Sequence, residues 1–102
     1  FKPDRKNTKR LEAEFRQATK PLRKAIEKHE KTMAEAHKKL QALEGQLSET
    51  EIYSAENKAK LKQILAEQAA LKSNLEETEM DWLDAQEQLE IQQQQFQQDS
   101  NS

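Results

Sequence analysis

The sequence predicts an all-α fold in which two long helices pair as an antiparallel coiled-coil hairpin. Hydrophobic residues make up only 33% of the 102 residues and charged residues 35%, which leaves too little apolar surface for a layered core. One glycine, two prolines and no valine exclude a chain of many short strands. The apolar residues instead recur every three or four positions in two separate rows, which is the pattern of helices that share a narrow seam.

The first helix is expected over about residues 9–47, where the apolar row follows a 3.5-residue repeat. Because Pro21 lacks an amide donor, we expect either a kink there or a fresh helix start with the proline in its first turn. Leu11 and Ala18 lie one position early for the repeat, and a local rotation near the proline would bring them inward. Gly45 fits either a left-handed C-cap or a position inside the last turns. The row comprises Leu11, Phe15, Ala18, Leu22, Ile26, His29, Met33, Ala36, Leu40, Leu43 and Leu47.

The connection is expected over residues 48–54, and its shortness makes the two helices antiparallel neighbours. Ser48 and Glu51 have the spacing of a capping box, which predicts a short helical turn within the connection. Ile52 and Tyr53 are expected to fold over the open end of the hairpin and close it.

The second helix is expected over about residues 55–97, where the row steps by three and four residues throughout. Residues 1–8 are predicted to be a flanking linker. Residues 98–102 end a glutamine-rich, low-complexity stretch and are predicted to be a disordered tail. The second row comprises Leu61, Ile64, Gln68, Leu71, Leu75, Thr78, Trp82, Ala85, Leu89, Gln92 and Phe96.

Charge is distributed unevenly along the chain and favours the hairpin. Residues 1–40 hold 13 Lys and Arg against 6 Asp and Glu, a net charge of +7, whereas residues 73–102 hold 8 acids and no Lys or Arg. The two regions would attract each other if the chain doubled back. A register in which paired residue numbers sum to 104 runs from a Leu22–Trp82 layer to a Leu43–Leu61 layer. It also creates three opposite-charge pairs: Arg23–Glu79, Glu30–Lys72 and Lys39–Glu67.

Several kinds of chemistry are excluded by what the sequence lacks. Without cysteine there can be no disulfide, thiolate metal site or cysteine nucleophile. The two histidines, His29 and His37, lack the spacing of a helical zinc pair, and His29 is expected in the seam. With no catalytic constellation or phosphate-cradling loop, we predict no catalytic, cofactor-binding or metal-binding residue. No apolar run approaches the ~20 residues of a membrane span, and Phe1 in place of a starting methionine suggests a piece of a longer protein.

Two surfaces remain once the seam is assigned. Basic residues share the outer face of the first helix, either as a track for nucleic-acid phosphates or as an ordinary solvated helix surface. Few aromatic residues are exposed, so such binding would be nonspecific and sensitive to salt. On the second helix, Met80, Leu83 and Ile91 lie off the seam, either as a protein-docking patch or as stray exposed apolar residues. The candidate nucleic-acid-binding residues are Lys9, Arg16, Lys20, Lys24, Lys28, Lys31 and Lys38.

Three stretches of the chain together resemble the C-terminal coiled-coil domain of bacterial ABC-F ATPases, and the resemblance extends over nearly the whole chain except the glutamine-rich tail. The most telling feature is the run that contains Trp82, in combination with the tyrosine of the connection. The stretches are Pro21-Leu22-Arg23-Lys24-Ala25-Ile26, then Glu51-Ile52-Tyr53, and finally Leu71-Lys72-Ser73-Asn74-Leu75-Glu76-Glu77 continuing to Trp82-Leu83-Asp84-Ala85-Gln86-Glu87-Gln88-Leu89-Glu90.

The resemblance implies a soluble, cytoplasmic parent protein with two ATP-binding cassettes, which use ATP and Mg, and no membrane domain. Such proteins act on the ribosome near the tRNA exit site, and their C-terminal hairpin is linked to nucleic-acid contact, including DNA in the Uup branch. The cassette motifs are absent from this chain, so ATP hydrolysis would belong to the rest of the parent. We therefore expect a non-catalytic, monomeric module that binds rRNA, tRNA or DNA through phosphates. The alternative is a structural arm that docks on the cassettes or on a protein partner.

Overall fold

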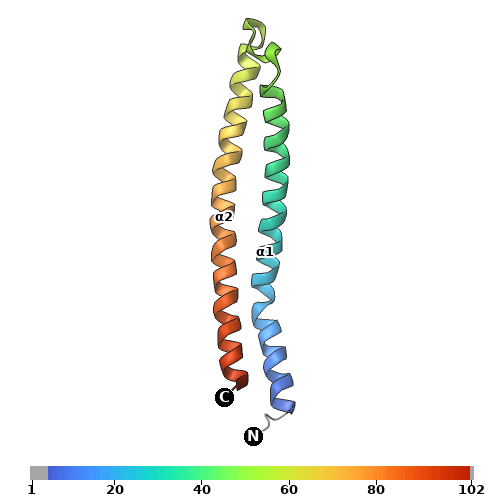
Figure 1. The fold of residues 1–102 in the computed structure, drawn as a ribbon, viewed down its shortest axis with the longest axis vertical. Helices are drawn as coiled ribbons and strands as arrows, with labels where there is room; N and C mark the ends of the chain where they lie inside the picture. The colour runs from blue at the N-terminus through green and yellow to red at the C-terminus, as the bar shows by residue number, and fades with distance from the viewer. Residues whose placement is uncertain (1–4, 102) are drawn as a thin grey trace. The chain divides into compact units, whose positions relative to one another are not determined.

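The computed structural model describes residues 5–101 and consists of two long helices and a short connection. Helix α1 (Arg5–Leu47) and helix α2 (Lys58–Asn101) are joined by two 3₁₀ turns, η1 (Thr50–Tyr53) and η2 (Ala55–Asn57) (Figure 1). No strand occurs within residues 5–101. The predicted all-α fold of two helices and a short helical connection is confirmed.

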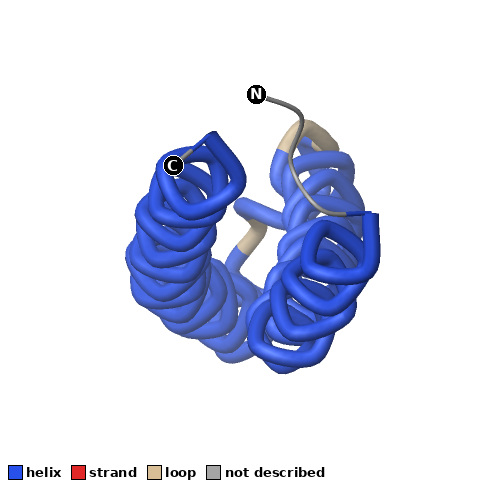
Figure 2. The backbone as a smooth tube through the Cα atoms, turned by 90° about the horizontal axis from the view of Figure 1, so that it is seen from below, coloured by secondary structure: helices blue, strands red, loops and turns tan. Residues whose placement is uncertain are grey.

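The helices contribute to two compact units. Among the described residues, the terminal unit combines residues 5–28 with residues 81–101, and the turn unit is the continuous stretch 29–80. Within each unit a stretch of α1 lies beside a stretch of α2 that runs in the opposite direction (Figure 1). Figure 2, which looks from the chain ends, shows the two helical stretches of the terminal unit as adjacent coils.

The core of the turn unit closes beneath the connection. Leu43 of α1, Ile52 of η1 and Ile64 of α2 form one buried cluster, and the half-buried side chains of Leu47, Leu61 and Leu71 pack against it. Ile52 therefore closes the open end of the hairpin, as the sequence predicts. Tyr53 behaves differently, because its ring is 61% exposed and its hydroxyl donates a 2.7 Å hydrogen bond to the carbonyl of Leu47. The Tyr53 hydroxyl thus supplies a hydrogen-bond donor to a carbonyl in the last turn of α1, where the helix no longer provides an amide donor.

The capping box predicted for the connection does not form. The hydroxyl of Ser48 donates to the carbonyl of Gly45 at 2.7 Å, and η1 instead begins after Glu49, with no side-chain cap. Gly45 lies inside α1 and has no positive φ, so it is not a left-handed C-cap. Helix α2 begins at Lys58, three residues later than predicted, because residues 55–57 form η2.

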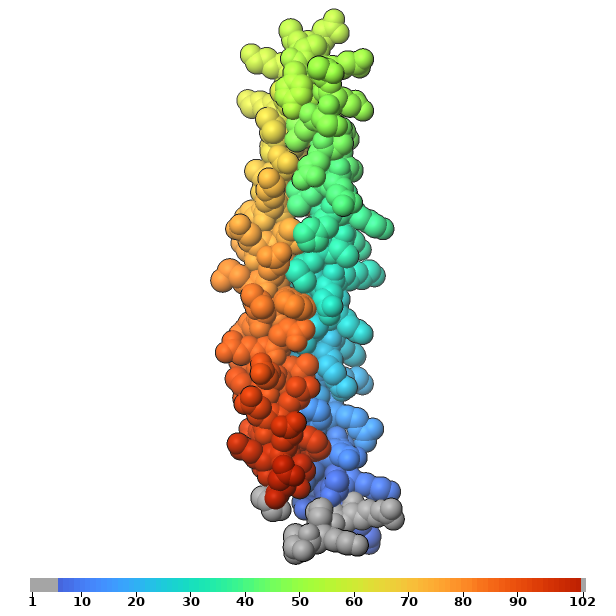
Figure 3. Space-filling view, in the orientation of Figure 1, coloured from blue at the N-terminus to red at the C-terminus, as the bar shows by residue number. Residues whose placement is uncertain are grey.

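The terminal unit is held together by one aromatic pair and a few buried side chains. The rings of Phe15 and Phe96 stack with centroids 4.7 Å apart and planes tilted by 30°, and Ile26 and Ala85 are buried. Figure 3 shows the two helical stretches of this unit in contact along their length. Helix α2 continues to Asn101, so residues 98–101 are helical and not the predicted tail.

Helix α1 begins at Arg5, four residues before its predicted start, and the rest of the predicted linker lies outside the described residues. Its seam matches the prediction except at one position. Thr19 has no exposed surface, and Ala18 is exposed, so the predicted rotation of Ala18 into the seam is wrong. The hydroxyl of Thr19 donates to the carbonyl of Phe15 at 2.8 Å, which satisfies it without leaving the helix. On α2, all eleven predicted seam residues are buried or half-buried.

Helix α1 runs through Pro21 as one continuous helix. A fresh helix start at this residue, one of the two predicted alternatives, is therefore wrong, and the kink stays a prediction. The guanidinium of Arg23 donates through Nη2 to the carbonyl of Arg16 at 2.9 Å.

The predicted register differs from the Phe15–Phe96 contact of the terminal unit, whereas Leu43 and Leu61, one predicted layer of the turn unit, lie in the same apolar cluster. In the terminal unit, a sum of 104 would place Phe15 opposite Leu89, but Phe15 stacks on Phe96. In the turn unit, Lys39 and Glu67 line one shallow groove, yet the described residues of this unit form neither the Lys39–Glu67 nor the Glu30–Lys72 ion pair. Exposed ion pairs contribute about 0.2–1 kcal/mol each, whereas burying one large apolar side chain contributes about 1.5–3 kcal/mol, so apolar packing sets the register.

Candidate nucleic-acid interface

The seven basic residues predicted to face outward are all exposed on α1. Five of them, Lys9, Arg16, Lys20, Lys24 and Lys28, belong to the terminal unit, and Lys31 and Lys38 belong to the turn unit. We call the terminal-unit set the basic face. From residue 16 onward its members recur every four residues, so neighbouring cations form a ridge with a rise of about 6 Å per step, on the side of α1 away from the seam.

Not every cation of the basic face is equally available. Lys28 already has an interaction partner within the chain. Glu27 is exposed three residues after Lys24 and brings a negative charge to the same part of the helix. The positions on which a phosphate contact can be argued are therefore Lys9, Arg16, Lys20 and Lys24.

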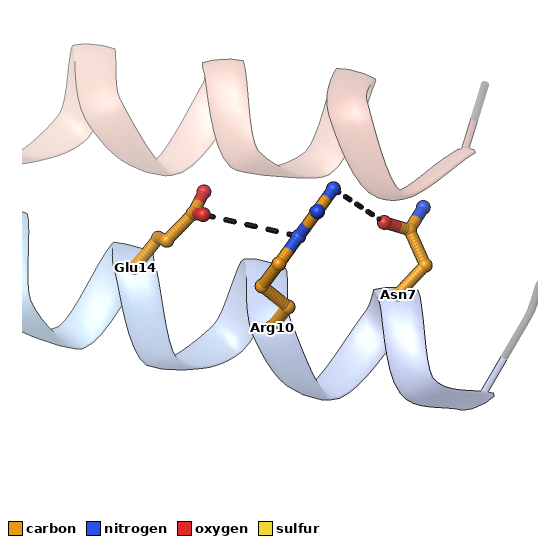
Figure 4. Close-up of polar contacts among 3 residues, drawn as sticks. All are labelled: Asn7, Arg10 and Glu14. Atoms are coloured by element: carbon orange, nitrogen blue, oxygen red, sulfur yellow. Dashed lines mark hydrogen bonds and ion pairs between the residues drawn. The ribbon is translucent and has the colours of Figure 1, made fainter.

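Arg10 shows why some basic residues of the terminal unit lie outside this face. Its Nη2 donates to Oδ1 of Asn7 at 2.9 Å, and its Nε lies 3.9 Å from Oε1 of Glu14 (Figure 4). Both side chains of the ion pair are about two-thirds exposed, at 70% and 66%, so it adds little to stability. It does, however, hold the Arg10 guanidinium against its own helix.

Arg23 is a second cation that the local backbone engages, and sequence reasoning missed this role. Its hydrogen bond to the Arg16 carbonyl spans Pro21, the one position of α1 that cannot donate an amide hydrogen. A proline inside a helical pattern, with an arginine shortly after it, is the signal that could have predicted such a contact.

Helix α2 gives the terminal unit an opposite electrostatic side. Its stretch in this unit carries five carboxylates and no lysine or arginine. A polyanion would therefore be attracted to α1 and repelled by α2 within the same unit. The carboxylates are Asp81, Asp84, Glu87, Glu90 and Asp99.

The predicted protein-docking residues are all exposed. Met80 is 72% exposed in the turn unit, whereas Leu83 and Ile91, 58% and 49% exposed, belong to the terminal unit. Leu83 lines a shallow groove with Glu87 and Glu90, and Ile91 lies outside it. The structure adds two exposed side chains, Leu65 and Tyr53, that the sequence analysis does not predict to be exposed.

Within residues 5–101, no three histidine, cysteine or acidic side chains come together in a way that could hold a metal ion. His29 is half-buried in the seam, as predicted. The described helices include none that is long and apolar enough to cross a bilayer.

Comparison with known proteins relates the chain to one segment of a much larger protein. It is 50% identical over 86 residues to the probable ATP-binding protein YheS of Escherichia coli strains K12 and O157:H7, which covers 84% of this chain but only 14% of that protein. The protein of the same name from Haemophilus influenzae is 50% identical over 42 residues, or 41% of the chain and 7% of its own length. No family model and no solved structure matches the chain. The resemblance to a segment of an ABC-F ATPase is confirmed.

Proposed function

We propose that this chain is a non-catalytic nucleic-acid-binding segment of an ABC-F ATPase, and that it contacts phosphates through the basic face of its terminal unit. The observation that carries the proposal is the ridge formed by Arg16, Lys20 and Lys24, with Lys9 two turns earlier, exposed on the side of α1 away from the seam. Successive lysine and arginine side chains at such spacing can neutralise successive phosphates of one strand.

The same surface argues for contact with the backbone and against readout of bases. Aromatic rings that could stack on bases are held in the seam: in the described part of the terminal unit, Phe15, Phe96 and Trp82 are all half-buried. Binding by phosphate contacts alone carries no sequence information and weakens steeply with salt. We therefore expect similar affinities for DNA and RNA duplexes of unrelated sequence.

A charge-reversal experiment tests the proposal. The double variant Lys20→Glu with Lys24→Glu is compared with Lys58→Glu with Lys62→Glu, an exposed pair of the same spacing on α2. Binding of short fluorescent DNA and RNA duplexes is followed by anisotropy at several salt concentrations. The first variant should lose affinity and the second should retain it. Equal losses, or the absence of salt-dependent binding by the unaltered chain, would overturn the proposal.

The whole protein's role belongs to the same proposal, since the chain spans 14% of the length of the E. coli relatives. Their printed name describes an ATP-binding protein, which supports a parent whose cassettes bind ATP and Mg outside this chain. By the family resemblance we place that parent in the cytoplasm and on the ribosome, where this segment would reach rRNA or tRNA. Crosslinking and sequencing with the intact parent would test this, and crosslinks that avoid residues 9–24 would contradict it.

A second candidate is supported by one observation, the 58% exposure of Leu83 in a groove with Glu87 and Glu90. An exposed leucine beside carboxylates suits a protein segment that carries both an aliphatic and a basic side chain. In this case the chain would be a structural arm docked on the cassettes or on a protein partner. If Leu83→Asp abolishes the function of the parent and reversal of Lys20 and Lys24 does not, this candidate replaces the first.

A further inference from the structure

The turn of α1 before Pro21 should be the weakest part of that helix. Pro21 has no amide hydrogen for the carbonyl of Gln17, and its ring crowds the preceding turn. Such positions usually kink or end a helix, yet α1 continues to Leu47.

Two side chains, one on each side of Pro21, hydrogen-bond to carbonyls of that turn. The hydroxyl of Thr19 donates to the carbonyl of Phe15 at 2.8 Å and lies 3.5 Å from the carbonyl of Arg16. The guanidinium of Arg23 donates to the same Arg16 carbonyl at 2.9 Å. The Arg16 carbonyl therefore accepts hydrogen bonds from side chains on both sides of Pro21.

We propose that Arg23 is a positioning residue of the basic face and not one of its phosphate ligands. Its bond to the Arg16 carbonyl bridges the proline and keeps Arg16 and Lys20, which precede Pro21, in phase with Lys24, which follows it. The consequence for binding rests on the proposed function, whereas the effect on the helix does not.

The bridge suits arginine for a physical reason. A guanidinium makes a charge-assisted hydrogen bond, which is stronger than a bond between neutral groups, and its long side chain leans toward the N-terminus of its helix, where the Arg16 carbonyl lies. Each residue advances a helix by about 100°, so a change of even part of a turn at Pro21 would rotate Lys24 away from the line of Lys20.

A double-mutant cycle tests the bridge without nucleic acid. The variant Pro21→Ala restores the amide donor to the Gln17 carbonyl and removes the ring that crowds the preceding turn, so that turn should no longer need the Arg23 bond; Arg23→Gln is therefore made both in the unaltered chain and in the Pro21→Ala variant. Amide hydrogen exchange is measured across residues 16–24. In the unaltered chain, Arg23→Gln should speed exchange by about fivefold, and in the Pro21→Ala variant it should have little effect. Unchanged exchange in the chain that keeps the proline, or an equal change in both backgrounds, would refute the bridge.

Binding to a short DNA duplex by the same four proteins tests the positioning role. In the chain that keeps Pro21, Arg23→Gln should weaken binding without changing the salt dependence, and in the Pro21→Ala variant the loss should disappear. A phosphate ligand would instead show the same loss in both backgrounds and a slope of log K against log salt shallower by about 0.9, which would overturn the proposal. If exchange behaves as expected while none of the four proteins binds, the bridge stands and the proposed function fails.

Discussion

The salt dependence of binding gives the sharpest test of the basic face. Four cations of the basic face, Lys9, Arg16, Lys20 and Lys24, are exposed on α1. If each neutralises one phosphate, log K should fall with log salt with a slope of about −3.6 for duplex DNA and about −2.8 for a single strand. Between 50 and 200 mM salt the duplex affinity should therefore fall roughly 150-fold. Replacing Lys20 with glutamine removes one contact and should make the duplex slope shallower by about 0.9.

The assay is fluorescence anisotropy with a short labelled duplex, repeated at each salt concentration for the unaltered chain and for Lys20→Gln. The matched control is Lys62→Gln, an exposed lysine on α2, which should leave the slope unchanged. A slope near zero for the unaltered chain would show that the four cations do not contact phosphates. Equal slope changes in the two variants would show that binding depends on total charge and not on this face.

Three further predictions concern the stability of the turn unit, each measured as the free energy of unfolding from denaturant titration. Gly45→Ala should raise the free energy of unfolding by about 0.5–1 kcal/mol, because Gly45 is inside α1 with no positive φ and an added Cβ would meet nothing within 4 Å. A loss of stability would show that this position needs glycine. Ile52→Ala should lower the free energy of unfolding by about 2–4 kcal/mol, since removing a side chain that is only 6% exposed would leave a cavity. A loss below about 1 kcal/mol would mean that Ile52 does not close the end of the hairpin. Tyr53→Phe should lower the free energy of unfolding by about 0.5 kcal/mol, because the hydrogen bond from Tyr53 to the Leu47 carbonyl is exposed and exposed bonds contribute little. An unchanged free energy would mean that water satisfies this carbonyl equally well.

Most of the fold could be predicted because helical periodicity reports burial directly. The α2 row holds even where its members are polar: Gln68, Thr78 and Gln92 are half-buried at positions that the repeat alone assigns to the seam. A period of 3.5 residues leaves only one stripe of a helix able to face a partner continuously, so residue type matters less than position.

The sequence predictions that are wrong give more weight to the apolar character of a residue than to its position in the helical repeat. The apolar character of Ala18 predicts it in the seam, but the spacing back from Leu22 places Thr19 inward instead. Burial of Thr19 costs little because its hydroxyl bonds to a carbonyl of the same helix. In the terminal unit the predicted register is wrong for a related reason, since it rests partly on exposed ion pairs, which contribute less than apolar contacts such as the Phe15–Phe96 stack.

The exposure of the residues in the candidate interface could be predicted from the sequence. Once the seam is known, the exposure of Lys20 and Lys24 follows from their spacing. The engagement of Arg10 and Arg23 by groups of their own helix was not predictable, because it depends on side-chain geometry within a few ångströms. Sequence periodicity therefore separates inner from outer residues, and only the structure separates the cations held by their own helix from those left to solvent.

The separation of charge between α1 and α2 in the terminal unit also affects how a ligand would approach. Cations on one helix and carboxylates on the other give this unit an electric dipole across the helix axes. The field of an approaching polyanion exerts a torque on that dipole, over a range of about 10 Å at 0.1 M salt. Encounters would therefore begin with the α1 side already turned toward the polyanion, and added salt should slow association as well as weaken the complex.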